Sequence, residues 1–192
     1  MKMISVTVLT GFLGSGKTTL LSHLLRHPEM GRTAVIINEF GEMGLDHELV
    51  ETSEEDFVEL ITGCLCCRLR DDLVLTLHDL LARRRRGEVT AFEQIVIETT
   101  GLADPAPILQ TLASDVALAE TLKLANVVTT VDALLGVAAL TRCTASARQV
   151  AVADKLVLTK TDLVDNDGQR LLSNVRKLNP WAPLHSAVNG RI

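Results

Sequence analysis

The sequence predicts an α/β domain built on a doubly wound, mostly parallel sheet. Apolar, β-branched segments alternate with helical segments along the chain, as they do where parallel strands are joined by crossover helices. Segments 33–37 and 94–97 are almost continuously apolar, which indicates a sheet covered on both faces. The expected strands are 3–10, 33–37, 56–61, 94–98, 125–131, 155–159 and 183–187, and the expected helices are 17–27, 68–86, 105–112, 132–140, 144–153 and 165–178.

Length and composition favour one domain with an aliphatic core. The 192 residues are 47% hydrophobic but only 3% aromatic. The apolar runs are too short to span a membrane, and the first residues lead into a strand rather than a signal peptide, so we expect a cytoplasmic protein without a membrane partner. A net charge of −5 and a pI near 5.5 argue against nucleic acid as a partner.

A phosphate-binding motif follows the first expected strand. Residues 11–18 fit G-x-x-x-x-G-K-[ST] at every fixed position, between a strand and an apolar-faced helix. This context argues against a chance glycine loop and predicts a P-loop NTPase. Lys17 is expected to reach the β- and γ-phosphates, and the Thr18 hydroxyl to bind Mg²⁺. The predicted nucleotide-binding residues here are Gly11, Gly14, Ser15, Gly16, Lys17, Thr18 and Thr19.

A second phosphate-side element ends the strand at 94–98. Glu98 is a candidate to hold Mg²⁺ through water or to orient the attacking water. The Gly101 amide is a candidate to bind the γ-phosphate. A solvated strand end is the alternative for Glu98. Lys17 and Glu98 are therefore the predicted catalytic residues. Asp104 and Pro105 fit the N-cap and first position of the next helix.

The segment T-K-T-D at 159–162 predicts guanine as the base. A carboxylate at Asp162 can accept hydrogen bonds from N1–H and the exocyclic amine of guanine, a donor pair that adenine lacks. The aliphatic part of Lys160 can lie over the base. Thr159 replaces the asparagine of the usual N-K-x-D motif. The alternative role for Asp162 is to cap the following helix.

Three cysteines within four positions, Cys64, Cys66 and Cys67, are expected to open a helix after the strand at 56–61. They can present two or three sulfurs to one soft cation. A helix N-terminus with Arg68 and Arg70 nearby would lower the thiol pKa values. A redox pair of Cys64 and Cys67, and plain buried thiols, stay open as alternatives.

Other polar residues have weaker assignments. Glu39, in the loop after the second strand, is a candidate link between the nucleotide Mg²⁺ and a metal on the cysteines. His47 is expected at the surface and Cys143 in a helix facing the core. The arginines at 83–86 fit a helix end, where cations favour the dipole; a docking patch for an acidic partner is the alternative.

Five blocks in order resemble the CobW-like family of P-loop GTPases, relatives of the UreG and HypB metallochaperones. They are G-F-L-G-S-G-K-T-T at 11–19, N-E-F-G-E at 38–42, G-C-L-C-C at 63–67, E-T-T-G-L-A-D-P at 98–105 and T-K-T-D-L at 159–163. The resemblance implies a GTP-hydrolysing metal chaperone or insertase, in which nucleotide state controls a transition metal, Zn²⁺ or Co²⁺. It assigns the metal to Cys64, Cys66 and Cys67, the nucleotide and Mg²⁺ to Lys17, Thr18, Glu39, Glu98, Lys160 and Asp162, and the loop over guanine to Ala187 and Val188.

The resemblance also sets expectations for domains and partners. Many family members carry a C-terminal domain, so residues 1–192 are expected to be the GTPase domain alone. The expected partners are GTP, GDP and a client metalloprotein or cofactor-synthesis enzyme, and a homodimer stays open. Two alternative functions remain: a non-catalytic metal buffer that uses GTP as a structural ligand, and a P-loop small-molecule kinase, against which T-K-T-D argues.

Overall fold

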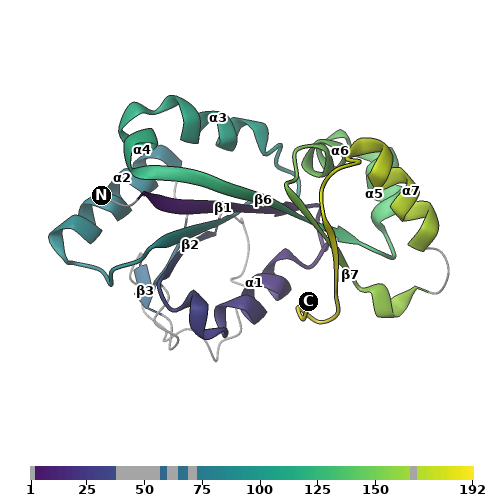
Figure 1. The fold of residues 1–192 in the computed structure, drawn as a ribbon, viewed down its shortest axis with the longest axis horizontal. Coiled ribbons are helices and arrows are strands. Elements are labelled where there is room, and N and C mark those ends of the chain that lie inside the picture. The colour runs from purple at the N-terminus through teal and green to yellow at the C-terminus, as the bar shows by residue number, and fades with distance from the viewer. Residues whose placement is uncertain (1–2, 38–56, 60–64, 69–72, 165–167) are drawn as a thin grey trace.

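The computed structural model describes residues 3–37, 57–59, 65–68, 73–164 and 168–192 (Figure 1). These residues form an eight-stranded sheet in the order β3-β4-β2-β5-β1-β6-β7-β8. Neighbouring strands are parallel except β3 and β4, which pair antiparallel. The strands are β1 (Ile4–Gly11), β2 (Thr33–Ile37), β3 (Phe57–Glu59), β4 (Leu65–Arg68), β5 (Gln94–Glu98), β6 (Leu122–Asp132), β7 (Lys155–Thr159) and β8 (Leu184–Ala187).

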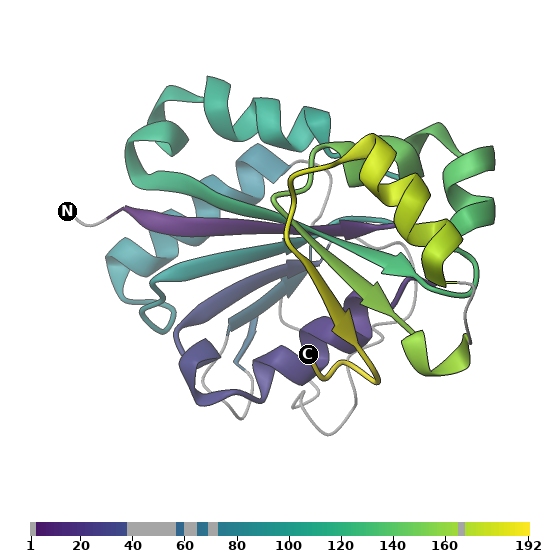
Figure 2. The same cartoon turned by 45° about the vertical axis from the view of Figure 1, so that its right-hand side comes forward.

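Helices cover both faces of this sheet, which confirms the doubly wound prediction (Figures 1 and 2). On one face, Leu20, Leu21 and Leu25 of α1 pack against β1 and β2. The opposite face packs against α2, α3 and α4 near β1, and against α6 and α7 near β7. The helices are α1 (Lys17–Leu25), α2 (Leu73–Arg86), α3 (Ala106–Ser114), α4 (Val116–Thr121), α5 (Gly136–Arg142), α6 (Thr144–Ala151) and α7 (Gly168–Leu178), with short 3₁₀ turns η1 (Pro28–Met30) and η2 (Thr161–Leu163).

The cysteine motif departs most from the sequence-based expectation. Cys66 and Cys67 lie in β4, alongside Val35 and Ile36 of β2, and residue 68 is the last residue of that strand. The predicted helix start at residue 68 is therefore wrong, and with it the argument that a helix N-terminus lowers the thiol pKa values. Hydrogen bonding to a strand on each side, β2 and β3, explains why these residues are extended rather than helical.

Smaller corrections concern helix ends. The helix expected from residue 132 begins at Gly136, because β6 continues to Asp132. Cys143 was expected inside a helix and in the core; it is the extended residue between α5 and α6, and it is half-buried. Helix α4 was not predicted from the sequence. None of the helices in the described ranges has the length and apolar character that a membrane crossing would need.

Candidate functional site

The phosphate-binding loop connects β1 to α1, in the strand–loop–helix context that its motif requires (Figure 1). Gly11, Gly14 and Gly16 all have positive φ, at 144°, 69° and 83°. A Cβ atom at residue 11 would lie 2.3 Å from Thr130 Oγ1, so only glycine fits there. Ser15 Oγ shares a hydrogen bond of 2.7 Å with Thr130 Oγ1. The loop is thus held against the neighbouring strand β6.

Lys17, the first residue of α1, is almost fully buried, with 5% of its surface exposed. Its ammonium donates to the carbonyl oxygens of Gly11 at 3.2 Å and Phe12 at 3.4 Å. These contacts keep the charge at the loop itself, where the motif predicts the phosphates. The Lys17 side chain is therefore held near the expected phosphates by burial and by these two hydrogen bonds, and does not extend freely into solvent.

Thr18 and Glu98 meet although 80 residues separate them. Thr18 Oγ1 donates to Glu98 Oε1 at 2.6 Å, and Glu98 is fully buried at the end of β5. Burial excludes the solvated strand end considered from the sequence. A hydroxyl beside a carboxylate offers the hard oxygen ligands that Mg²⁺ prefers, so these two side chains fit the ion expected with the nucleotide.

Gly101 lies directly against the phosphate-binding loop. A Cβ atom at this position would be 2.6 Å from the Leu13 nitrogen and 2.7 Å from its Cα. The loop after β5 is therefore in close backbone contact with the loop after β1. The next residues lead to α3, where Asp104 Oδ1 accepts a hydrogen bond of 3.0 Å from the Ala106 amide.

The base motif is also tied to the phosphate loop. Thr159, at the end of β7, donates from Oγ1 to the Ser15 carbonyl at 2.8 Å. The residue that replaces the usual asparagine thus contacts the loop through its hydroxyl. Lys160 follows in a left-handed conformation with φ of 56°, which turns the chain toward Asp162.

Asp132 holds Lys160 and was missed from the sequence. Asp132 Oδ2 accepts from Lys160 Nζ at 2.6 Å, and Oδ1 accepts from the amides of Leu134 and Leu135 at 2.8 and 3.0 Å. The carboxylate is nearly buried. Its position at the carboxyl end of a buried strand, in register with Thr159, was the signal that could have identified it.

Asp162 is exposed within η2. In the described part of the chain, no hydrogen bond from a backbone amide to its carboxylate supports the helix-cap alternative. Ala187 lies beside Thr159 in register, and Val188 pairs with Arg191 through two backbone hydrogen bonds of 3.0 Å. The segments expected to surround guanine therefore end adjacent strands, β7 and β8.

The predicted metal ligands are only partly placed. Glu39 and Cys64 lie outside the described residues, as does His47. Cys66 and Cys67 are placed by backbone in β4, next to β2, whose last residue, Ile37, precedes Glu39 by two positions. The described ranges contain no group of three or more His, Cys, Asp or Glu side chains that could hold a metal ion.

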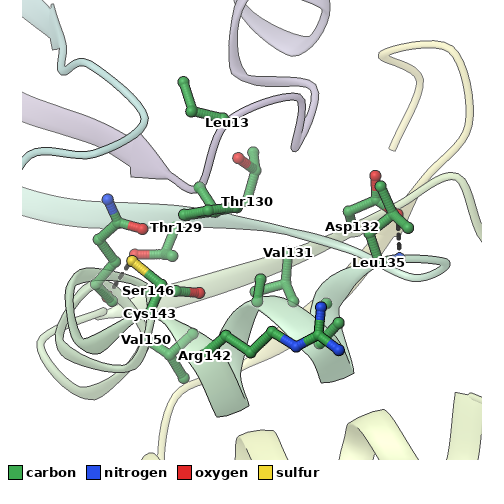
Figure 3. A pocket seen from close by; sticks show the side chains of 15 residues that line it. Leu13, Thr129, Thr130, Val131, Asp132, Leu135, Arg142, Cys143, Ser146 and Val150 are labelled. Carbon is green, nitrogen blue, oxygen red and sulfur yellow. Dashed lines mark hydrogen bonds between the residues drawn. The ribbon is translucent and has the colours of Figure 1, made fainter.

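A mostly apolar cavity of about 260 Å³ borders the phosphate loop (Figure 3). It lies between Leu13 of that loop, residues 129–132 of β6, and helices α5 and α6. Cys143 and Ser146 reach it from the helical side. Gln149, which sequence reasoning also missed, lines the cavity and donates from Nε2 to the carbonyls of Gly101 and Ala103.

Comparison with known proteins identifies the family. The nucleotide-binding domain of the CobW/HypB/UreG family matches residues 5–186. The chain belongs to this family. The zinc chaperone YjiA of Escherichia coli is 40% identical to this CobW-family domain over 192 residues, which are all of the chain and 60% of YjiA. The zinc-regulated GTPase metalloprotein activator 1 of Schizosaccharomyces pombe is 35% identical over 98% of the chain and 47% of its own length.

Solved structures agree with this assignment. The Zn(II)-bound YjiA GTPase from E. coli matches the CobW-family domain with a TM-score of 0.83 and 39% identity, covering the whole chain and 60% of YjiA. HypB from Helicobacter pylori, solved in complex with nickel, matches with a TM-score of 0.64 over 98% of the chain and 80% of HypB, but at 15% identity it supports the fold alone. The chain thus spans about half to two thirds of the length of these chaperone and activator relatives.

Proposed function

We propose that residues 1–192 form the GTPase domain of a zinc chaperone, which hydrolyses GTP and couples nucleotide state to the handling of Zn²⁺. The observation that carries the proposal is the convergence of Lys17, the Thr18–Glu98 pair and the T-K-T-D segment on one phosphate loop. Relatives described as zinc chaperones and a zinc-regulated GTPase support the choice of reaction and cargo. A kinase for a small molecule would not require the guanine-reading Asp162.

Hydrolysis would proceed at the loop between β1 and α1. Lys17 neutralises charge that develops between the β- and γ-phosphates. Glu98 accepts the Thr18 proton in its hydrogen bond and so orients the hydroxyl oxygen for a cation. Mg²⁺, when bound there, neutralises phosphate charge. Among the residues that the structure describes, we assign no glutamine to positioning the attacking water, so we expect slow turnover without a partner.

Zinc is the cargo in this proposal, with Cys64, Cys66 and Cys67 as its ligands. The strand β4 that carries Cys66 and Cys67 lies beside β2, and the Glu39 segment follows β2 along the chain. Cys67 pairs with Ile36 and is followed by the last residue of β4, so its backbone lies near the carboxyl edge of the sheet, where the loops after β1 and β2 begin. Order imposed by the γ-phosphate could therefore reach the metal ligands. A client metalloprotein would receive the metal in the cytoplasm.

Two measurements test the proposal. Competition between GTP and ATP should favour GTP by about two orders of magnitude, and Asp162→Asn should shift the preference toward a xanthine nucleotide. Equal affinity for ATP would overturn guanine recognition. Lys17→Ala should abolish phosphate release. If this variant releases phosphate as fast as the wild type does, the activity has another source.

Coupling is tested by titrating Co²⁺, a spectroscopic substitute for Zn²⁺, into the apo, GDP and non-hydrolysable GTP forms. The thiolate charge-transfer band reports binding, and Cys66→Ser with Cys67→Ser should remove it while GTP still binds. Metal affinity should differ between GDP and GTP forms by about 5- to 150-fold. Identical affinity in all three forms would favour the non-catalytic metal buffer or a GTPase with a separate metal site.

A further inference from the structure

Helix α6 contacts the loop after β5 through a fully buried carboxamide. Gln149 has no exposed surface, and its Nε2 donates to the Gly101 carbonyl at 3.2 Å and the Ala103 carbonyl at 2.9 Å. Only the nitrogen end of a carboxamide can donate to carbonyl oxygens, so these two bonds determine its orientation. Its Oε1 has no hydrogen-bond partner among the described residues. Both side-chain hydrogen bonds of Gln149 therefore go to the loop after β5.

Helix α6 is itself fixed to the sheet at the same residue. Thr129 of β6 donates from Oγ1 to the Gln149 backbone carbonyl at 2.8 Å, in a buried contact. The neighbouring Arg148 donates to Asp104 Oδ2 at 2.6 Å, but its side chain is 61% exposed. Exposed ion pairs contribute little, whereas loss of a buried donor leaves carbonyls unsatisfied. Gln149 is thus the stronger of the two attachments.

The segment that Gln149 holds lies on the phosphate loop. Gly101 leaves no room for a Cβ atom against the Leu13 backbone, so its position relative to that loop is tightly constrained. Residues 101 and 103 cannot shift without breaking the Gln149 contacts. The amide of Gly101 is the group expected to meet the γ-phosphate, which GTP has and GDP lacks.

We infer that Gln149 is a positioning residue for recognition of the γ-phosphate. By holding the carbonyls of Gly101 and Ala103 it keeps the Gly101 amide at the phosphate loop, and it so discriminates GTP from GDP without touching either nucleotide. The inference rests on the proposed GTPase function and adds to it a residue from a helix outside the nucleotide motifs.

The chain offers a matched control in a second buried carboxamide. Asn179, with 7% of its surface exposed, donates from Nδ2 to the carbonyls of Val150 at 3.0 Å and Ala153 at 2.8 Å. It binds the last residues of α6 and the turn that follows, close to Gln149 in sequence, but none of its hydrogen bonds within the described residues goes to residues 101–103. Removing either carboxamide should destabilise the fold to a comparable degree, but only the loss of Gln149 should release the Gly101 loop.

The experiment compares Gln149→Leu with Asn179→Leu. Leucine is close in size, and the cavity beside Gln149 gives its branched end room. Affinities for GDP and a non-hydrolysable GTP analogue are measured by titration calorimetry, with melting temperature as the measure of stability. We expect Gln149→Leu to lower the GTP-analogue affinity relative to GDP by about tenfold, and Asn179→Leu to lower the melting temperature without changing that ratio.

An unchanged ratio in Gln149→Leu, or an equal change in both variants, would overturn the inference. A wild-type protein that binds neither nucleotide would instead overturn the proposed function. If Gln149→Leu does not fold, Gln149→Met supplies the same test, because its unbranched side chain also lacks donors and adapts to irregular space.

Discussion

Adding one methyl group at Gly101 tests the contact between the two phosphate-side loops. In Gly101→Ala the new Cβ would lie 2.6 Å from the Leu13 nitrogen, whereas ordinary contacts begin at 3.4 Å. The loops must therefore separate by about 0.8 Å, the difference between these distances. Both sides of the contact are held, by Gln149 on one loop and by Thr159 on the other, so the strain cannot relax through a flexible side chain.

The expected cost has two parts. Overpacking of this kind destabilises by about 1–3 kcal/mol, and each kcal/mol lowers the melting temperature of a domain of this size by about 2–4 °C. A displacement near 1 Å at a reacting group can reduce turnover by about 100-fold. We expect Gly101→Ala to show both effects in thermal unfolding and in single-turnover GTP hydrolysis.

Gly136→Ala provides the control. Its Cβ would lie 2.9 Å from Leu171 Cδ1 and 3.0 Å from Val131 Cγ1, which are side-chain ends in the core. Side-chain ends can move more readily than backbone, so we expect Gly136→Ala to reduce hydrolysis far less than Gly101→Ala does. If Gly101→Ala has wild-type stability and turnover, the close approach of the two loops and the reasoning built on it are refuted.

Three further predictions follow from single contacts. Asp132→Asn keeps an acceptor for the backbone amides but removes the charge that holds Lys160. Because that lysine is 38% exposed, we expect the free energy of GDP binding to weaken by about 1 kcal/mol, seen as about fivefold weaker binding in a fluorescence titration. Binding equal to that of the wild type would contradict this prediction. Thr159→Val should lower the free energy of unfolding in urea by about 1–2 kcal/mol, because it leaves a buried carbonyl unsatisfied. Thr159→Ser, which keeps the hydroxyl, should retain most of that stability. A helix amide and a guanidinium lower the pKa of Asp104, so its contribution is present at neutral pH and lost as the pH falls through the folded-state pKa; the melting temperatures of wild type and Asp104→Asn should converge in acid, and a constant difference would refute this.

Features carried by contiguous residues were predictable from the sequence. The phosphate loop needs glycines, Lys17 and Thr18 at fixed spacing, so its motif contains nearly all of its geometry. The doubly wound sheet was predictable because apolar strands and amphipathic helices alternate along the chain. Family membership followed from five short blocks in order, and the match over residues 5–186 confirmed it.

The sequence was misleading where a segment's conformation depends on its neighbours. Residues 65–68 were expected to lead into a helix, but they hydrogen-bond to β2 on one side and to β3 on the other, which makes them a strand. Cys143 was expected in the core, yet the chain turns there between α5 and α6. In both cases tertiary contacts outweigh local propensity.

The amino-acid sequence alone predicts the chemistry available at the site: a lysine, a hydroxyl and carboxylates in recognisable motifs. The groups that hold these residues in place become visible in the folded structure. Thr159 reaches Ser15 across 144 residues, and Gln149 reaches Gly101 across 48. Such contacts arise when strands and helices distant in sequence pack together, and they have no spacing or periodicity that a linear pattern could record. The motif residues indicate the reaction, and the packing of β7 and α6 against the phosphate-side loops determines the positions of those residues.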